Sequence, residues 1–374
     1  MAEMDFALSF PRIVFGPGSV SRLPEELAAL GIRRPLLVSD PGLVRLGHVN
    51  RVADLLGPQC TVFAETPENP TSAGVMAAVA RYREGQCDAV VALGGGSAID
   101  TAKLTAVIAG QGGEPATYLG HPERVEMTAR PVAVVPTTAG TGSDSSPDAG
   151  IHPDAQSISA GITSRFAVPR LALCDPELTV TLPASLTAAT GLDAISHCVE
   201  GYLAKGDNPL ADTLALDGLA RAWRWVEVAT GDGQNIEARG QMLLAAWEGG
   251  IAIAKGLGPA HAIAISCGDQ GLHHGRLSAL GVLAMLGLMR EKLPERVAAL
   301  NRAAGLSPSA DFGAALKALM QRLSLPVTLA QAGYRMGDMD ALAHACAASH
   351  FNVTAGYRPG AAEYRMMLEV ISGQ

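Results

Sequence analysis

A carboxylate and an imidazole stand four residues apart in TGLDAISHCVEGYLA, residues 190–204. On a helix this spacing places Asp193 and His197 on one face, and the apolar neighbours Leu192 and Ile195 indicate that the helix is largely buried. A buried polar pair needs a partner. The partner is either the Asp–His hydrogen bond itself or a divalent cation, and the pair alone leaves both possibilities open.

Three of the nine histidines lie in GPAHAIAISCGDQGLHHG, residues 258–275. His261 is followed by small and apolar residues, and the doublet His273–His274 precedes a glycine. If these histidines fold back onto the Asp–His pair, one aspartate and three histidines form a mixed nitrogen and oxygen site that suits Fe²⁺ or Zn²⁺. Such a cation polarises an alcohol or carbonyl oxygen as a Lewis acid. The spacing alone does not decide which histidine of the doublet binds.

A strand–glycine–helix junction is predicted in DAVVALGGGSAIDTAK, residues 88–103. Glycines let the backbone approach a ligand, and the free N–H groups at a helix start point at an anion. The junction therefore indicates a phosphate site, although a tight turn without a ligand would use the same residues. The candidate cofactor-binding residues are Gly95, Gly96, Ser97 and Asp100.

Two more polar segments follow predicted strands. Asp40 ends PLLVSD, where a carboxylate can bond an adenosine ribose and would repel the 2′-phosphate of NADP, so NAD is the expected cofactor. A helix N-cap is the alternative role for Asp40. The segment VVPTTAGTGSDSSPD, residues 134–148, offers hydroxyls for phosphate, ribose or carboxamide from Thr137, Thr138, Thr141 and Ser143.

The elements that position these residues fall into two classes. Continuous Val/Leu/Ala runs alternate with helical patterns in the first half, which predicts a parallel sheet buried on both faces. Long Ala/Leu-rich helical patterns dominate from about residue 185, and residues 110–131 are expected to form a surface loop or hairpin. We therefore expect an α/β dinucleotide-binding domain over 1–183 and an all-α domain over 184–374. The expected strands lie within 12–16, 35–40, 60–65, 88–96, 131–138 and 171–178.

Composition excludes several classes of protein. The chain has 374 residues, of which 48% are hydrophobic and 17% charged, so it is expected to be globular. The net charge of −8 argues against a nucleic-acid or anionic-membrane surface. The expected partner is a small-molecule substrate, whose class the family resemblance described below implies. The six scattered cysteines and the lack of a visible signal peptide fit a cytoplasmic location.

Together these segments resemble the iron-containing (group III) alcohol dehydrogenase family over most of the chain. The resemblance implies an N-terminal dinucleotide-binding domain, a helical domain, and a metal and nicotinamide in the cleft between them. It also implies NAD(P)-linked interconversion of an alcohol and an aldehyde or ketone, in homodimers or larger homo-oligomers. The strings that carry it are IVFGPGSVSRLP, LLVSDPGL, ENPT, ALGGGSAIDTAK, PTTAGTGSD, PRLALCDPELTVTLP, TGLDAISHCVEGYLA and HHG.

Carried over by position, the resemblance implies that Asp193, His197, His261 and His274 bind the metal, with Fe²⁺ preferred over Zn²⁺. His274 is selected over His273 because the family's last ligand precedes a glycine. It also implies that Gly95, Gly96 and Ser97 hold the pyrophosphate, that Thr137, Thr138 and Thr141 line the cofactor, and that Asp40 meets the ribose.

The chain also departs from the family pattern. Many members have a second histidine four residues after the position of His261, where this chain has Ile265, and the spacing from His261 to His274 is one residue shorter than expected. Many members have a lysine within the stretch 155–169, where Arg165 is the only cation here. We therefore name His273 as the candidate catalytic residue in place of the missing proton carrier, a task that a relay of water and the cofactor ribose could also perform. A surface or supporting role is the alternative for His273.

Three rival hypotheses remain at the sequence level. One is a metal- and NAD-dependent lyase similar to dehydroquinate synthase, which shares this architecture but would need a cluster of cations for a phosphorylated substrate. Another is an oxidoreductase specialised for an anionic aldehyde, with Arg165 or Arg358 as the counter-charge. The third is a non-catalytic sensor of nucleotide or metal.

Overall fold

The protein is described by a computed structural model that covers residues 8–154 and 157–373. The chain divides into two compact units, each of which is described by itself. The sheet unit comprises residues 9–138 and 143–182. The helical unit comprises residues 183–373 together with Leu8 and the short segment 139–142.

One six-stranded sheet runs through the sheet unit, and every neighbouring pair of its strands is parallel. The strand order is β1-β8-β5-β4-β2-β3. The predicted parallel sheet is therefore confirmed. Its strands are β1 (Arg12–Phe15), β2 (Pro35–Val38), β3 (Thr61–Phe63), β4 (Ala89–Gly94), β5 (Val132–Pro136) and β8 (Leu171–Cys174).

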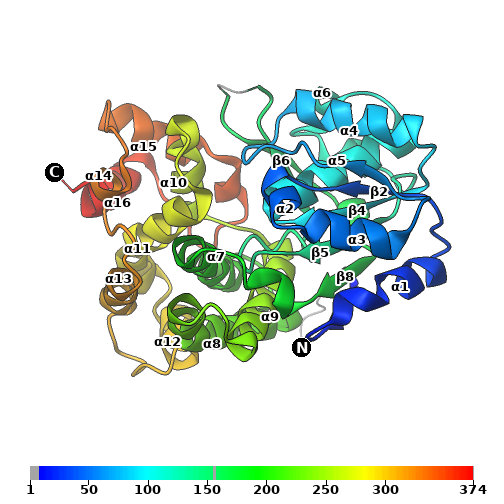
Figure 1. The fold of residues 1–374 in the computed structure, drawn as a ribbon. Coiled ribbons are helices and arrows are strands. Elements are labelled where there is room, and N and C mark those ends of the chain that lie inside the picture. Colours follow the sequence, from blue (N-terminus) through cyan, green and yellow to red (C-terminus); the bar gives the residue numbers. More distant parts are fainter. Residues whose placement is uncertain (1–7, 155–156, 374) are drawn as a thin grey trace. The chain divides into compact units, whose positions relative to one another are not determined.

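Helices cover both faces of this sheet, as Figure 1 shows. One hydrophobic cluster joins Leu37, Val91 and Val135 of the strands to α1, α2 and α3. A second cluster forms around α4 and α5, and α5 packs on β4 and β5. The continuous apolar runs of the strands follow from burial on both faces. The helices are α1 (Leu23–Ala29), α2 (Pro41–Arg45), α3 (His48–Leu56), α4 (Ser72–Glu84), α5 (Gly96–Gln111) and α6 (Pro115–Tyr118).

A separate two-stranded antiparallel sheet was not expected from the sequence. It pairs β6 (Asp148–Ile151) with β7 (Ala160–Thr163). Of the loop or hairpin predicted for residues 110–131, the hairpin is wrong, because that segment contains no strand but the short helix α6 and a 3-10 turn at Pro122–Arg124. The prolines at 115 and 122 each occupy the first turn of these elements, where the missing N–H is tolerated.

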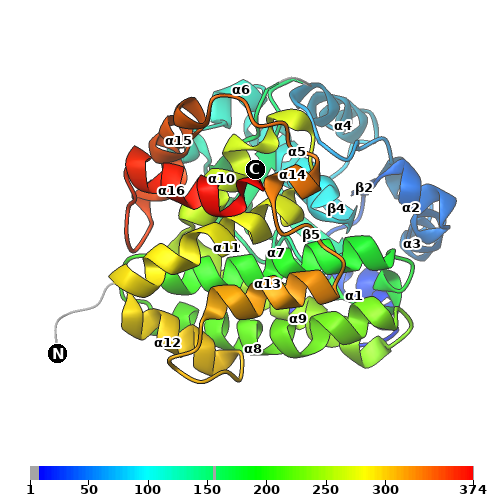
Figure 2. The ribbon, with the colours of Figure 1, turned by 90° about the vertical axis from the view of Figure 1, so that its left-hand side faces the viewer.

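The helical unit is built around α7, which packs against α8, α9 and α11 (Figure 2). The helical pattern of residues 278–305 is divided between α11 and α12, because Pro294 cannot continue a helix but suits its first position. The helices are α7 (Ala184–Leu203), α8 (Pro209–Gly231), α9 (Ile236–Ala252), α10 (Pro259–Ser266), α11 (His274–Lys292), α12 (Pro294–Ala303), α13 (Phe312–Arg322), α14 (Leu329–Ala332), α15 (Met339–Ala348) and α16 (Ala361–Ser372).

Within the described residues, no single helix is both long and apolar enough to cross a bilayer. One pair of helices, Ile236–Lys255 and Pro259–Gln270, passes by length and composition together but is bent by 100°.

Candidate functional site

Helix α7 carries the first half of the candidate metal centre. Asp193 and His197 lie one helical turn apart, and both are buried, with 2% and 4% of their surface exposed. This burial was predicted from the apolar neighbours. It arises because other helices cover α7 along most of its length. The buried Asp193 and His197 therefore need polar partners from other elements.

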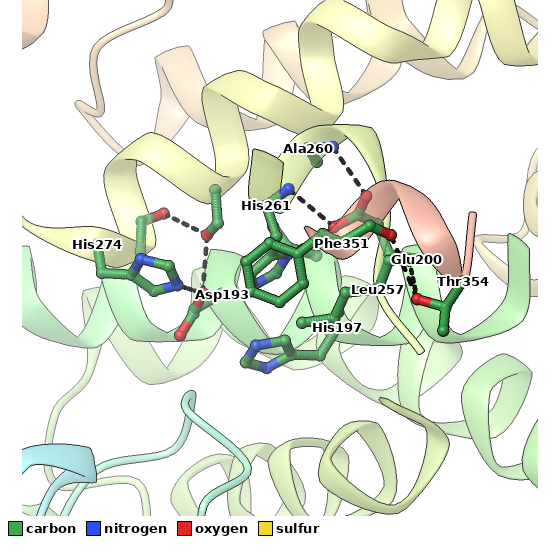
Figure 3. Close-up of polar contacts among 12 residues, drawn as sticks. Asp193, His197, Glu200, Leu257, Ala260, His261, His274, Phe351 and Thr354 are labelled. Atoms are coloured by element: carbon green, nitrogen blue, oxygen red, sulfur yellow. Dashed lines mark hydrogen bonds and ion pairs between the residues drawn. The ribbon is translucent and has the colours of Figure 1, made fainter. Parts of the chain in front are cut away.

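Three predicted ligands meet in the helical unit. One ligating atom from each of Asp193, His261 and His274 can be chosen so that all three lie within 4.8 Å of one another. His274 Nε2 is 3.9 Å from Asp193 Oδ1. The fourth predicted ligand, His197, lies beside this cluster, with its ring stacked on that of His261 at 5.0 Å between centroids (Figure 3).

Glu200 of α7 orients His261 of α10. The Nδ1 atom of His261 donates to Glu200 Oε2 at 2.5 Å, and the same carboxylate accepts the backbone N–H groups of Ala260 and His261. Because Nδ1 is used in this bond, Nε2 is the nitrogen that is left for a metal. Sequence reasoning had assigned no role to Glu200, although its position seven residues after Asp193 places it on the same helix face.

Two other contacts orient Asp193 and His197. Ser278 Oγ donates to Asp193 Oδ1 at 2.7 Å, and His197 Nδ1 lies 3.1 Å from the carbonyl oxygen of Gly140. A carbonyl only accepts, so Nδ1 of His197 carries the proton and Nε2 has the free lone pair. Asp193, His197 and His261 are thus each held by a neighbour outside the cluster, which is the usual arrangement around protein metal sites.

The electrostatics of the cluster suit a divalent cation. Burial opposes ionisation of Asp193, but the three neighbouring histidines overcome it and hold its pKa at about 2. Burial lowers the pKa of His197, so its imidazole is neutral at neutral pH. An ionised carboxylate and neutral imidazoles are the protonation states in which these groups bind metals. The residues present therefore fit Fe²⁺ or Zn²⁺.

The histidine doublet is divided between two tasks. His274 is the first residue of α11 and belongs to the cluster. His273 is the N-cap of the same helix, where its Nδ1 accepts the backbone N–H of Gly275 at 3.2 Å. Ile265, where the resemblance led us to expect a histidine, is half-buried near the end of α10. The catalytic role of His273 stays a prediction.

The predicted adenosine site lies where the strand order reverses. Strand β3 lies on one side of β2 in the sheet, and the next strand along the chain, β4, lies on the other side of β2. In α/β sheets such a reversal is where ligands bind, beyond the carboxyl ends of the strands. Asp40 follows β2 and caps α2, because its Oδ1 accepts the N–H groups of Gly42 and Leu43. Its other oxygen lies beside Gly94 at the end of β4, 3.6 Å from where a Cβ would stand.

The loops after β4 and β5 touch each other. A Cβ at Gly95 would lie 3.1 Å from Thr138, and Thr137 donates its backbone N–H to Gly94. Gly94 has φ +154°, a value that side chains disfavour. Ser97 donates its hydroxyl to the carbonyl of Glu68 at 2.5 Å, so its backbone N–H at the start of α5 is the group that suits a phosphate.

The other predicted cofactor residues lie in different surroundings. Asp100 accepts the backbone N–H of Gly150 at 2.9 Å and so bonds within the sheet unit. Ser143 is buried. Gly96 is the first residue of α5. Thr141 is half-buried and lies in the segment 139–142, which belongs to the helical unit.

Models of known protein families match most of the chain. Residues 11–176 match the model described as iron-containing alcohol dehydrogenase, and residues 187–367 match the C-terminal model of the Fe-containing alcohol dehydrogenase family. The chain is 44% identical to a 4-hydroxybutyrate dehydrogenase from Cupriavidus necator, over 94% of this chain and 96% of the relative. It is 32% identical to an NAD-dependent methanol dehydrogenase from Bacillus methanolicus, over 89% and 91%.

Solved structures resemble the chain over nearly its full length. A 1,3-propanediol oxidoreductase aligns with a TM-score of 0.89 and 27% identity, over 98% of this chain and 99% of its own. A sulfoacetaldehyde reductase from Bifidobacterium kashiwanohense, solved with NAD⁺, aligns with a TM-score of 0.91 and 25% identity over the whole of both chains.

Proposed function

Because the chain belongs to the iron-containing alcohol dehydrogenase family, we propose that it is a metal- and NAD-dependent oxidoreductase acting by hydride transfer between an alcohol and an aldehyde or ketone. The observation that carries the proposal is the cluster of the buried Asp193 and His261 with the partly exposed His274, and with Glu200 behind His261. That cluster offers the donors of a divalent metal site. The homo-oligomer and the cytoplasmic location expected above stay predictions.

The residues of the helical unit have separate tasks in this proposal. Asp193, His261, His274 and His197 would hold the cation, which when bound supplies Lewis acidity toward the substrate oxygen. Glu200 keeps Nε2 of His261 directed at the cluster, and Ser278 orients Asp193. The apolar surroundings of α7 keep water away from the buried Asp193 and so strengthen the electrostatic effect of its charge.

The sheet unit would bind NAD, which supplies the acceptor for the hydride. The N–H groups at the start of α5 would meet the pyrophosphate, and the absence of a Cβ at Gly95 lets Thr138 pack close beside them. Asp40 would bond the ribose through Oδ2, since Oδ1 is used by α2. Thr137 and Thr138 offer hydroxyls beside that cradle.

The proton of the substrate hydroxyl needs an acceptor, and the structure weakens the case for His273. Because its Nδ1 accepts the N–H of Gly275, the neutral ring carries its proton on Nε2 and has no free lone pair there. His273 could take a proton only by giving up its cap. We therefore propose that the main role of His273 is to cap α11.

The direct test uses the purified chain after chelation, with Fe²⁺ or Zn²⁺ restored. Alcohols with NAD⁺, and aldehydes with NADH, are screened while NADH is followed. We expect turnover that requires both the metal and the nicotinamide. Release of phosphate from a phosphorylated substrate with no net NADH would support the lyase hypothesis instead. Binding of metal and nucleotide without any turnover would support the sensor hypothesis.

A second candidate is oxidation of a hydroxycarboxylic acid, favoured by the 44% identity to a 4-hydroxybutyrate dehydrogenase. The two cations named from the sequence differ in surroundings. Arg165 of the sheet unit stacks its guanidinium on Phe166, and Arg358 of the helical unit is exposed. Comparing 4-hydroxybutyrate with 1-butanol, in the original chain and in Arg165→Gln and Arg358→Gln, tests whether either arginine favours the anion. A preference for 1-butanol in the original chain would exclude this candidate.

A further inference from the structure

Helix α5 carries a lysine that is fully buried. Lys103 has no exposed surface, and its Nζ donates to the carbonyl oxygens of Ser146 at 2.9 Å and Asp148 at 2.6 Å. Lysine is rarely buried unless it is paired. These two bonds tie α5 to residues 143–150, which we call the tether segment. It follows residues 137–142, the β5 loop, and includes the start of β6.

Two carboxylates complete this buried group. Asp100, one turn before Lys103 on α5, accepts the N–H of Gly150 and a hydrogen bond from Ser143. Asp144 of the tether segment is 3% exposed and is attracted by Lys103. Burial raises the pKa of each carboxyl to about 6 against that attraction. Asp100 and Lys103 therefore hold the tether segment at both of its ends.

The positions of Asp100 and Lys103 on α5 connect them to the loops after β4 and β5, which are predicted to bind the cofactor. The first turn of α5, which begins at Gly96, is the predicted pyrophosphate site. The tether segment begins directly after residues 137–142, which include all three threonines predicted to line the cofactor. Helix α5 therefore carries the predicted phosphate site in its first turn. One to two turns later it holds the tether segment, which continues the chain from residues 137–142.

We propose that Lys103 and Asp100 are positioning residues for NAD, which set the β5 loop at a fixed distance from the pyrophosphate site. They act through the tether segment, and neither needs to touch the cofactor. This inference rests on the proposed NAD binding. It predicts that loosening the tether weakens contacts beyond the pyrophosphate while the adenosine and diphosphate contacts, made at Asp40 and the start of α5, are retained.

The test compares two nucleotides by titration calorimetry in the metal-loaded protein. NAD⁺ reaches both loops, whereas ADP has only the adenosine and diphosphate. In Lys103→Met we expect the dissociation constant of NAD⁺ to rise about tenfold and that of ADP to change less than about twofold. The matched control is Lys317→Met, because Lys317 is an exposed lysine on α13, and neither constant should change there.

Asp100 supplies a second test that does not depend on the stability of Lys103→Met. Asp100→Ala loses the acceptor for Gly150 and should show the same loss selective for NAD⁺, whereas Asp100→Asn keeps an oxygen there and should recover most of it. Thermal unfolding of each variant checks that it is folded. If ADP and NAD⁺ weaken equally, or neither weakens, in folded variants, the inference is wrong and the proposed function stands. If the original chain binds neither nucleotide, both are wrong.

Discussion

Nδ1 of His261 lies 2.5 Å from Oε2 of Glu200, although the two residues are 61 positions apart in the chain and belong to different helices. Both side chains are almost fully buried. The same carboxylate accepts two N–H groups at the start of α10, where the helix dipole favours a negative charge. One residue of α7 therefore fixes both the position of α10 and the orientation of the imidazole that α10 presents to Asp193 and His274 in the candidate metal centre.

The first prediction concerns this contact. Glu200→Gln removes the charge and leaves one oxygen where two now accept three bonds, so His261 loses its fixed orientation. We expect the dissociation constant of the metal to rise about 10- to 100-fold, the usual effect of losing such a partner. Competition with a chelator measures it. Glu237→Gln, an exposed glutamate on α9, is the control. Unchanged affinity in Glu200→Gln would show that His261 is not a ligand.

The second prediction separates the two histidines of the doublet. His274→Ala removes a member of the cluster, and we expect it to abolish stoichiometric metal binding and turnover. His273→Asn retains a side-chain acceptor for Gly275, because asparagine is a favoured N-cap, so metal content and turnover should stay close to those of the original chain. Metal analysis and steady-state kinetics measure both. A loss of turnover in His273→Asn by about 100-fold or more, with metal retained, would instead support the proton relay.

The sequence predicted those parts of the structure whose signals are local. The six strands of the main sheet follow from continuous apolar runs, and the face shared by Asp193 and His197 follows from their helical spacing. The antiparallel hairpin was missed because its strands, DAGI and AGIT, contain glycine and alanine and show no clear alternation.

The supporting contacts were not predictable in the same way. Glu200 meets His261, and Lys103 meets the tether segment, only after distant parts of the chain have packed together. No local pattern marks such a partner, since a glutamate or lysine on a helix is most often solvated. The N-cap role of Asp40 was recognisable from SDPG, but whether its second oxygen faced the glycines depended on the neighbouring strands.

The third prediction tests cofactor choice at Asp40. Asp40→Asn keeps an oxygen for the N–H groups of Gly42 and Leu43, so α2 stays capped while the charge beside Gly94 is lost. We expect the preference for NAD⁺ over NADP⁺, measured as the ratio of kcat/KM values, to fall about tenfold, or about 1.4 kcal/mol. Asp54→Asn on α3 is the control, since Asp54 lies on a different helix. An unchanged ratio would place the ribose elsewhere.

The fourth prediction concerns pH and stability at Glu248. This side chain of α9 is buried against Arg221, whose Nε lies 3.3 Å from both of its oxygens, and Asp217 shares the same arginine. Burial raises the pKa of Glu248 to about 8, from an ordinary value of 4.5. Between these values the folded state holds a proton that the unfolded chain has lost. The stabilising contribution of this group is therefore present at low pH and is lost as pH rises toward 8.

Glu248→Gln removes this titration without removing the side chain's polar end. The free energy of unfolding of the original chain should fall more steeply than that of the variant between pH 5 and pH 8, by about 1 kcal/mol per pH unit. Denaturant unfolding at several pH values measures the difference, and groups that titrate in both proteins cancel from it. Glu237→Gln, exposed on the same helix, should follow the original chain. Parallel profiles for Glu248→Gln and the original chain would mean that Arg221 keeps this carboxylate ionised in the folded state.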